Sequence, residues 1–361
     1  MTAPPRSIFD LDGHDLAELL AGQPTYRVEQ VRAGLYEQLS PVSEISTLPA
    51  ALRSELDQRA PESLAELTRS ITDTGDTIKF LWALHDGATV ETVLMYSPDR
   101  VTVCISTQAG CAMNCSFCAT GQAGFERHLS VGEIVEQVIR SARVAAPRRI
   151  SNVVFMGMGE PLANLNPTMA AVRRFHGELG ISARHLTIST VGLIPGIRQL
   201  AHEPLPITLA VSLHAARDSL RNELVPINKK YPLADLAGAC RDYFEAKGRR
   251  LSFEWAMIAG VNDTTQDLEE LAQYARDLRA HVNLIPLNPT PGYPVIGTPP
   301  DLVGRFCSGL LERGVNATVR RTRGTDIDAA CGQLRTAHRE RSPSDRVPVK
   351  LRTRIDSDQN G

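Results

Sequence analysis

The chain has 361 residues, of which 42% are hydrophobic, and its 39 lysines and arginines nearly balance its 41 acidic residues. This composition fits a globular protein with a sizeable core and excludes collagen-like and disordered chains. No apolar run approaches the ~18 residues of a membrane helix, and the first residues hold no signal core, so we expect a cytoplasmic protein without a membrane partner. The near-neutral charge argues against a protein that coats nucleic acid by charge alone.

Residues 1–62 are predicted to form a small helical accessory domain. Their apolar residues recur at a spacing of three to four in 15–22, 28–39 and 48–60, and glycines and prolines separate these runs. Residues 63–100 are predicted to form a β-hairpin linker, because Asp86-Gly87 separates two β-prone runs.

Residues 101–341 alternate between strand-like and helix-like segments. The predicted strands are 101–106, 152–157, 185–190, 207–213, 251–258, 281–287 and 316–322. The predicted helices are 130–146, 166–179, 232–248, 264–280 and 299–314. Repeated βα units with apolar strands predict an α/β fold, a partial (β/α)6 barrel whose chemistry lies in the loops after the strands. The polar residues 342–361 are predicted to be a flexible tail.

The cysteines are the most informative residues. There are seven, an odd number that makes a poor disulfide framework, and four of them fall within residues 104–118. Cys111, Cys115 and Cys118 follow the first predicted barrel strand, with spacings of four and three. Structural zinc sites usually close four ligands with a second pair, which does not follow here. Three thiolates favour a [4Fe–4S] cluster with one open iron, and zinc is the alternative.

CxxxCxxC after the first strand of a partial barrel resembles the radical S-adenosylmethionine (SAM) superfamily. The chain also resembles one family within it, the RlmN adenosine C2-methyltransferases, from about Glu91 to Leu334. The matching stretches are ISTQAGCAMNCSFCATGQAGF, MGMGEPLANL, SLHAARDSLRNELVPINKKYPL, VNLIPLNP and GTDIDAACGQL. The close alternative is Cfr, which methylates C8 of the same adenosine. Pro161, Pro286-Leu287 and the NKKYP segment resemble RlmN rather than Cfr.

The resemblance implies cofactors and the residues that hold them. Cys111, Cys115 and Cys118 match the ligands of one [4Fe–4S] cluster. The residues that match SAM contacts are Gly159, Glu160, Ser189, Ser212, Leu213, His214 and Asn288. A carboxylate aimed at the SAM ammonium is a sensible charge-assisted contact. Each residue has a plainer reading: a solvated Glu160 capping a tight glycine turn, and elsewhere a buried polar residue bonded to its own backbone.

Three further residues match catalytic positions. Cys331 matches a methyl-carrying cysteine, Cys104 the cysteine that resolves the intermediate, and Glu91 a proton acceptor. The plainer readings are buried apolar cysteines and an exposed strand glutamate; the first also applies to Cys240 and Cys307.

The implied reaction uses two SAM molecules per turnover, an S-methylcysteine intermediate and a transient Cys104–Cys331 disulfide. Its implied substrates are adenosine 2503 of 23S rRNA and adenosine 37 of tRNA, with a reducing partner such as flavodoxin and a monomeric enzyme. A zinc-containing RNA-binding scaffold without catalytic activity is the alternative from another class.

Overall fold

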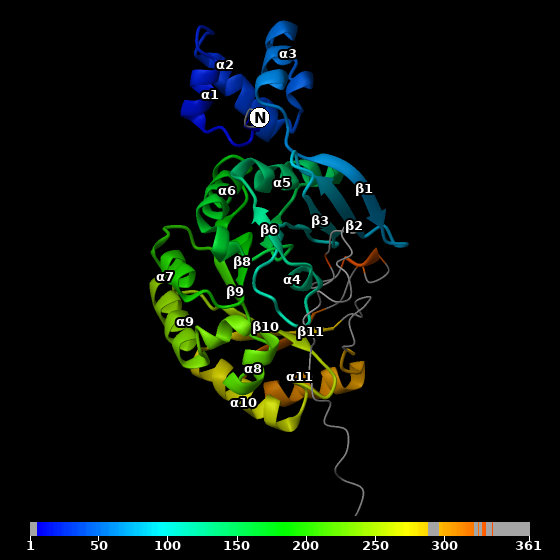
Figure 1. Cartoon of the computed structure of the whole chain (residues 1–361), viewed down its shortest axis with the longest axis vertical. Helices are drawn as coiled ribbons and strands as arrows, with labels where there is room; N and C mark the ends of the chain where they lie inside the picture. The colour runs from blue at the N-terminus through cyan, green and yellow to red at the C-terminus, as the bar shows by residue number, and fades with distance from the viewer. Residues whose placement is uncertain (1–5, 288–295, 321–323, 325–326, 330–333, 335–361) are drawn as a thin grey trace, which may run out of the picture. The chain divides into compact units, whose positions relative to one another are not determined.

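The computed structural model describes residues 6–287 and 296–320, together with residues 324, 327–329 and 334. The chain divides into two compact units, each treated by itself below. Unit 1 comprises residues up to 109 and residues 126–186, and unit 2 comprises residues 110–125 and those from 187 onward. Figure 1 labels their helices and strands. Within the described ranges, no helix has both the length and the apolar character needed to cross a membrane.

The first part of unit 1 is helical, as the apolar spacing predicted. Its elements are α1 (Gly13–Leu19), α2 (Tyr26–Arg32), a π-helical turn (Ala33–Glu37) and α3 (Ala50–Arg59). Asp12 caps α1, since its carboxylate accepts hydrogen bonds from the backbone N–H groups of His14 and Asp15. A Cβ at Gly34 would lie 2.6 Å from Cδ1 of Ile45, so the turn packs tightly onto the following segment.

The hairpin predicted around Asp86-Gly87 is confirmed. The strands of unit 1 are β1 (Ala65–Ile71), β2 (Thr77–Ala83), β3 (Thr89–Tyr96), β4 (Val101–Cys104) and β7 (Asn152–Phe155). The first four pair in antiparallel fashion, and β4 pairs in parallel with β7. Gly87 has a φ of +83°, and the Asp86 carboxylate accepts a hydrogen bond from the N–H of Ala88.

Two long helices of unit 1 match the predicted ranges. They are α5 (Val131–Ala145) and α6 (Leu165–Gly177). The Ser130 hydroxyl accepts a hydrogen bond from the N–H of Glu133, and the Glu133 carboxylate accepts one from the N–H of Ser130. This reciprocal pair is a capping box, and it sets where α5 begins.

The strands of unit 2 run parallel. They are β8 (Leu186–Thr190), which starts at the unit boundary, β9 (Thr208–Ser212), β10 (Ser252–Met257), β11 (His281–Pro286) and β12 (Ala317–Val319), paired in that order. The helices are α4 (Ala119–Ala123), α7 (Ile194–His202), α8 (Asp218–Leu224), α9 (Leu233–Lys247), α10 (Thr265–Asp277) and α11 (Pro300–Glu312). The short strands β5 (Gln108–Gly110) and β6 (Phe125–His128) flank the cysteine-rich segment.

The two faces of β10 differ in chemistry. Phe253 packs on Tyr274 of α10 with ring centroids 5.4 Å apart, and Trp255 packs on Phe306 of α11 at 6.4 Å. Glu254 points to the opposite face, because successive strand residues alternate. Its buried carboxylate accepts hydrogen bonds from the Ser252 hydroxyl and the Asn283 amide, and burial raises its pKa. One face is therefore packed on helices while the other carries polar groups.

Arg221 of α8 fixes the ends of two neighbouring strands in unit 2. The fully buried guanidinium donates through Nε to the carbonyl of Leu213 at 3.0 Å and through Nη2 to the carbonyl of Val191 at 2.7 Å. Nη1 donates to Oδ1 of Asn228 at 2.8 Å. Burial lowers the pKa of Arg221, which is the cost of placing a cation here. These carbonyls follow β8 and β9, so Arg221 sets the course of both connections.

We expect Arg221→Leu to lower the free energy of unfolding by about 3 kcal/mol or more, because each buried acceptor left without a donor costs ~1–3 kcal/mol. Urea unfolding followed by circular dichroism measures the change. Arg305→Leu is the control, since the Arg305 side chain is 73% exposed and pairs with its helix neighbour Asp301. That variant should change stability by less than about 0.5 kcal/mol. Equal losses in the two variants would contradict the structural role of Arg221.

Candidate functional site

The loop that carries the three motif cysteines lies in unit 2. The thiol groups of Cys111 and Cys115 are buried and that of Cys118 is half-buried. The N–H of Cys111 donates to the carbonyl of Gly124 at 2.8 Å, and the N–H of Cys118 donates to the carbonyl of Cys115 at 3.2 Å. Gln122 donates through Nε2 to the same Cys115 carbonyl. The backbone is thus held by its own segment, independently of any bound group.

The surroundings of this loop fit an iron–sulfur cluster. The Ser116 hydroxyl is buried and has no hydrogen-bond partner within the described part of the chain, so a donor is available at the residue that follows Cys115. A Cβ at Gly121 would lie 3.1 Å from the backbone nitrogen of Cys115, so α4 packs closely against the backbone of the cysteine loop. Apolar residues pack around Cys115: Ala215, Leu224, Val225 and Ile258. Three thiols in an apolar wall suit a soft, sulfur-rich group.

The ends of β8 and β9 bring three of the predicted SAM contacts together in unit 2. The hydroxyl oxygens of Ser189 and Ser212 lie 3.4 Å apart, and both residues are half-buried. Leu213 follows directly, with a fully buried side chain and an N–H that donates to the carbonyl of Glu254. Two hydroxyl groups on neighbouring parallel strands can bond a polar ligand at this edge of the sheet.

His214 has a defined ring tautomer. Its Nδ1 accepts a hydrogen bond from the N–H of Ala256 at 2.9 Å, so the proton of the neutral imidazole is on Nε2. Burial, followed by the charge of Arg221, lowers the pKa of His214 to about 3, which keeps the ring neutral. The ring meets Phe117 of the cysteine loop edge-on, with centroids 4.5 Å apart. A neutral donor therefore lies beside the segment that carries the cysteines.

The backbone of His214 is held in an uncommon conformation. Its φ is +58°, in the left-handed region that residues with a Cβ seldom adopt. The Asn262 amide donates to the His214 carbonyl at 2.8 Å and to the carbonyl of Ala256 at 2.7 Å. Such strain persists only where the surroundings over-determine it, and it is frequent at functional sites.

Gly159 and Glu160 lie in unit 1, in the turn that follows β7. Gly159 has a φ of +98°, and a Cβ there would lie 2.6 Å from Cβ of Gln108. Glycine is therefore required both by the backbone conformation and by the lack of space for a side chain. Glu160 is buried, and its Oε1 accepts a hydrogen bond from the N–H of Leu162. The alternative reading of Glu160 was a solvated residue that caps a turn. Glu160 does cap the next helical turn, but its side chain is buried and not solvated.

Cys104 and Glu91 share one face of the sheet in unit 1. Val93 of β3 pairs with Cys104 of β4, and paired residues point to the same side. Glu91 precedes Val93 by two residues, so it points to that side as well. Both are buried, and the Lys79 ammonium lies 3.3 Å from the Glu91 carboxylate. The reading of Glu91 as an exposed strand residue is wrong, and Lys79 is a neighbour that the sequence did not indicate.

Four remaining residues complete the predicted set. Cys331 and Asn288 lie outside the described residues, so their roles remain predictions. Cys240 is fully buried on α9, where burial raises the pKa of its thiol to about 12, as expected for an apolar cysteine. Cys307 on α11 is half-buried, which departs from the expected burial.

Several polar residues that support the site were missed. They are Ser106, Gln108, Gln137, Arg221 and Asn262, and their partners are mostly backbone groups far away in sequence. Gln108 stands three residues before Cys111, so its place in the motif is the one signal that could have found it.

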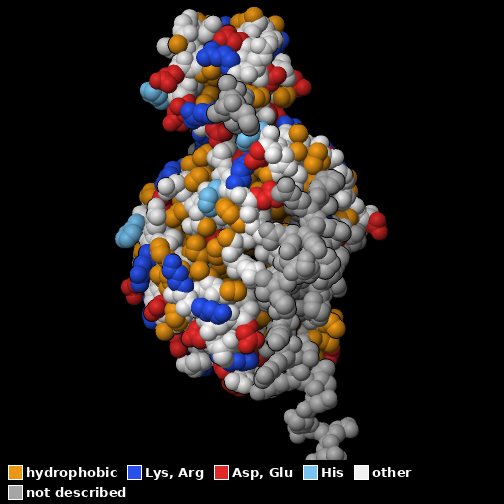
Figure 2. All heavy atoms as spheres, viewed as in Figure 1, with side chains coloured by type: hydrophobic (Ala, Val, Ile, Leu, Met, Phe, Trp, Pro, Cys, Tyr) orange, Lys and Arg blue, Asp and Glu red, His pale blue; other side chains and the backbone are white. Residues whose placement is uncertain are grey.

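Charge is mixed on the face that Figure 2 shows. Acidic and basic side chains are interspersed there among the described residues, rather than segregated by sign. This distribution agrees with the near-neutral composition of the whole chain. Any recognition of a polyanion over this face would then depend on individual contacts more than on a continuous basic surface.

Comparison with known proteins identifies the family. Residues 105–275 match the model of the radical SAM superfamily. The protein of Salinispora tropica named probable dual-specificity RNA methyltransferase RlmN is 49% identical, covering 92% of this chain and 94% of that protein. The Thermobifida fusca protein of the same name is 46% identical, with 92% and 95% covered.

A solved structure gives the same answer for the fold. The radical SAM methyltransferase of Sphaerobacter thermophilus is 49% identical and superposes with a TM-score of 0.89, covering 92% of this chain and 99% of that one. The predicted α/β fold of the radical SAM type is confirmed, and family membership implies a [4Fe–4S] cluster and SAM as cofactors. With motifs, fold and whole-length identity in agreement, this chain belongs to the RlmN family of radical SAM RNA methyltransferases.

Proposed function

We propose that the chain transfers a methyl group to C2 of adenosine 2503 in 23S rRNA and of adenosine 37 in tRNA. The observation that carries the proposal is the 49% identity, across 92% of the chain, to a protein named dual-specificity RNA methyltransferase. Burial of the Glu160 and Glu91 carboxylates, for which the plainer readings expected exposed side chains, supports it further. Both substrates present an adenine whose C2 edge must leave the RNA stack before it can react.

Family membership assigns a cofactor to each group of predicted contact residues. Cys111, Cys115 and Cys118 supply three thiolates to one [4Fe–4S] cluster, and Glu160 receives the ammonium group of SAM. Further SAM contacts are assigned to Ser189, Ser212, Leu213, His214 and Asn288. When bound, the cluster and SAM supply a 5′-deoxyadenosyl radical, and the protein supplies orientation and shielding. A one-electron donor of the flavodoxin type is the expected partner of a monomeric enzyme.

Two thiols are needed because C2 of adenine is electron-poor and cannot attack the SAM methyl group. The thiolate of Cys331 takes that methyl group by substitution, so a bond to its sulfur forms as the sulfonium bond breaks. One SAM is consumed as methyl source and a second as radical source. Once the carbon is joined to C2, the adduct loses the C2 proton and one electron, which returns to the one-electron donor system. The Cys104 thiolate then attacks the Cys331 sulfur, and the carbon leaves with the electron pair of the broken C–S bond and takes up a proton to become the methyl group of the base. A Cys104–Cys331 disulfide remains, and an external thiol reductant restores both thiols.

The proton on C2 needs an acceptor, and the shared face of β3 and β4 offers two. Glu91 and Cys104 point to the same side of the sheet, as diagonal neighbours on adjacent strands. Lys79 offsets the charge of the Glu91 carboxylate from 3.3 Å. The ion pair is charge-balanced while the carboxylate is ionised, so a proton taken up by Glu91 would leave the Lys79 charge without its counter-ion and has to be passed on.

Product analysis tests the reaction. Enzyme reconstituted anaerobically with reductant, SAM and unmodified 23S rRNA should yield 2-methyladenosine, identified by mass spectrometry of the nucleosides against methyladenosine standards. An enzyme heat-treated before SAM is added is the control. Finding 8-methyladenosine instead would assign Cfr-type chemistry, and finding 5′-deoxyadenosine without any methyladenosine would contradict the rRNA substrate.

Cysteine variants test the two thiols. Cys104→Ala should accumulate protein covalently joined to RNA, because nothing then cleaves the bond to Cys331. Cys331→Ala should abolish methyl transfer and form no adduct, since it lacks the carrier sulfur. Denaturing gel electrophoresis with labelled RNA distinguishes the two results. Cys307→Ala, on a helix outside the motifs, should form product without an adduct. Normal turnover by Cys104→Ala would contradict its resolving role.

A further inference from the structure

The buried side chain of Gln108 in unit 1 makes two hydrogen bonds of opposite polarity. Its Oε1 accepts from the N–H of Glu160 at 2.7 Å, and its Nε2 lies 3.0 Å from Nδ1 of His128. A backbone N–H can only donate, so the amide oxygen must face Glu160 and the amide N–H must face His128. His128 therefore accepts through Nδ1, which fixes the proton of its neutral ring on Nε2.

The same glutamine packs directly against the turn that carries Glu160. The carbonyl of Met158 accepts from the N–H groups of Thr107 and Gln108, at 2.9 and 3.3 Å. At Gly159, a Cβ would overlap the Gln108 side chain. The turn consequently has little room to move while Gln108 keeps its orientation, and the position of the Glu160 backbone follows from that of one amide.

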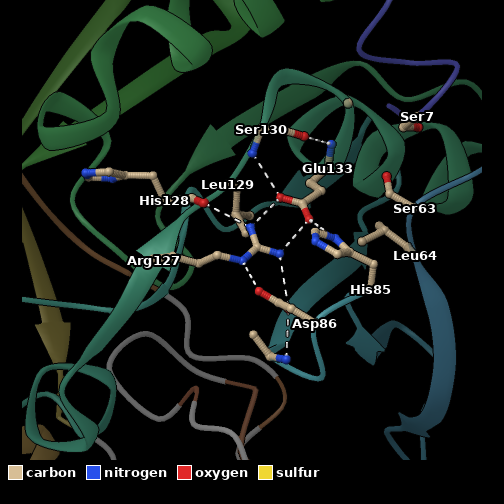
Figure 3. Close-up of polar contacts among 12 residues, drawn as sticks. Ser7, Ser63, Leu64, His85, Asp86, Arg127, His128, Leu129, Ser130 and Glu133 are labelled. Atoms are coloured by element: carbon tan, nitrogen blue, oxygen red, sulfur yellow. Dashed lines mark hydrogen bonds and ion pairs between the residues drawn. The ribbon is translucent and has the colours of Figure 1, made fainter. Parts of the chain in front are cut away.

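His128 belongs to a segment that is anchored by an arginine. Figure 3 shows the Arg127 guanidinium between the carboxylates of Glu133 and Asp86. Its Nη1 and Nη2 lie 2.8 and 2.7 Å from the Glu133 oxygens, and its Nε lies 2.5 Å from Oδ2 of Asp86. Nη1 also donates to the carbonyl of His128 at 3.0 Å. The end of β6 is thereby fixed to α5 and to the β2–β3 turn, so His128 offers Gln108 a stationary acceptor.

A second bridge holds this region without using either side chain. The buried amide of Asn164 donates to the carbonyl of Thr107 at 2.9 Å and to the carbonyl of Leu129 at 2.8 Å. The backbone next to Gln108 therefore stays joined to the backbone next to His128 when the bond between their side chains is lost. Removing the acceptor at residue 128 should release the amide of Gln108 and leave the local fold in place.

We propose that Gln108 and His128 act together as a positioning pair for SAM binding. His128 fixes the orientation of the Gln108 amide, and that amide holds the Glu160 backbone where its carboxylate can receive the ammonium group of SAM. This inference rests on the proposed role of Glu160 in binding SAM. Neither residue of the pair touches the reacting atoms, so both affect the affinity for SAM and not the chemistry that follows.

Two substitutions of similar size at residue 128 separate positioning from packing. His128→Leu removes the acceptor, whereas the Oδ1 of Asn in His128→Asn can still accept from Gln108. Equilibrium dialysis of SAM with anaerobically reconstituted enzyme should show about tenfold weaker binding for the leucine variant, the effect of losing one hydrogen bond between the buried Gln108 amide and the exposed His128 ring. The asparagine variant should recover most of the affinity. The 5′-deoxyadenosine rate at saturating SAM should stay within about twofold, while KM rises.

Equal SAM affinity of the leucine and asparagine variants would overturn the proposal. His185→Leu, the same change at an exposed histidine, controls for the loss of an imidazole. Gln108→Met provides an independent route, because it removes the amide and keeps the length of the side chain. It should weaken SAM binding to a similar extent, and its combination with His128→Leu should add nothing, as expected for two residues that act as one unit. Additive losses would contradict a single unit.

Hydrogen exchange gives a readout that does not need SAM. The amide of Glu160 should exchange faster in His128→Leu and in Gln108→Met than in the wild type or His128→Asn, because its acceptor is no longer held. Unchanged exchange in both variants would overturn the positioning role. Failure of the wild-type enzyme to bind SAM, with these exchange differences present, would instead contradict the proposed function and leave the pair intact as a structural device.

Discussion

The arrangement of unit 1 depends on how the chain leaves the sheet after Cys104. At Ser106, the side chain of Gln137 satisfies both backbone groups, since it accepts from the N–H at 2.8 Å and donates to the carbonyl at 3.0 Å. The Ser106 hydroxyl donates to the carbonyl of Glu91 and accepts from the N–H of Met158. Backbone groups this deep cannot remain unpaired. One buried amide and one hydroxyl thus join the strand of the candidate proton acceptor to the turn of Glu160.

In unit 2, a charged side chain satisfies the buried backbone groups that follow the strands. There the carbonyls that follow β8 and β9 are collected by the guanidinium of Arg221, and the left-handed His214 is held by the amide of Asn262. A planar cation with five donors can satisfy more acceptors than a neutral amide, which has only two N–H donors. Burial removes the guanidinium from water, and this desolvation lowers the pKa of Arg221.

Local sequence patterns predicted the long helices and the strands, whereas hydrogen bonds between residues far apart in the sequence could not be predicted. The capping box of Ser130 and Glu133 and the turn at Asp86-Gly87 are set by neighbours in sequence, so the strands and helices around them were predictable. The helices α7 and α8, of nine and seven residues, were not predicted. Gln108 pairs with residues 20 and 52 positions away, and periodicity carries no information on such partners. The alternative reading of Glu91 as an exposed strand residue fails because both faces of β3 are covered, which is a tertiary property.

The burial of Cys240 makes it a reporter of local opening. Burial raises the pKa of its thiol to about 12, so the thiol is protonated at neutral pH, whereas the thiolate is the form that attacks alkylating reagents. No surface path leads to this sulfur while α9 stays packed, since the residue has no exposed area. Its modification by a maleimide would therefore occur at the rate at which α9 separates from its neighbours. The labelling rate of Cys240 would therefore report the local opening of α9 without an introduced label.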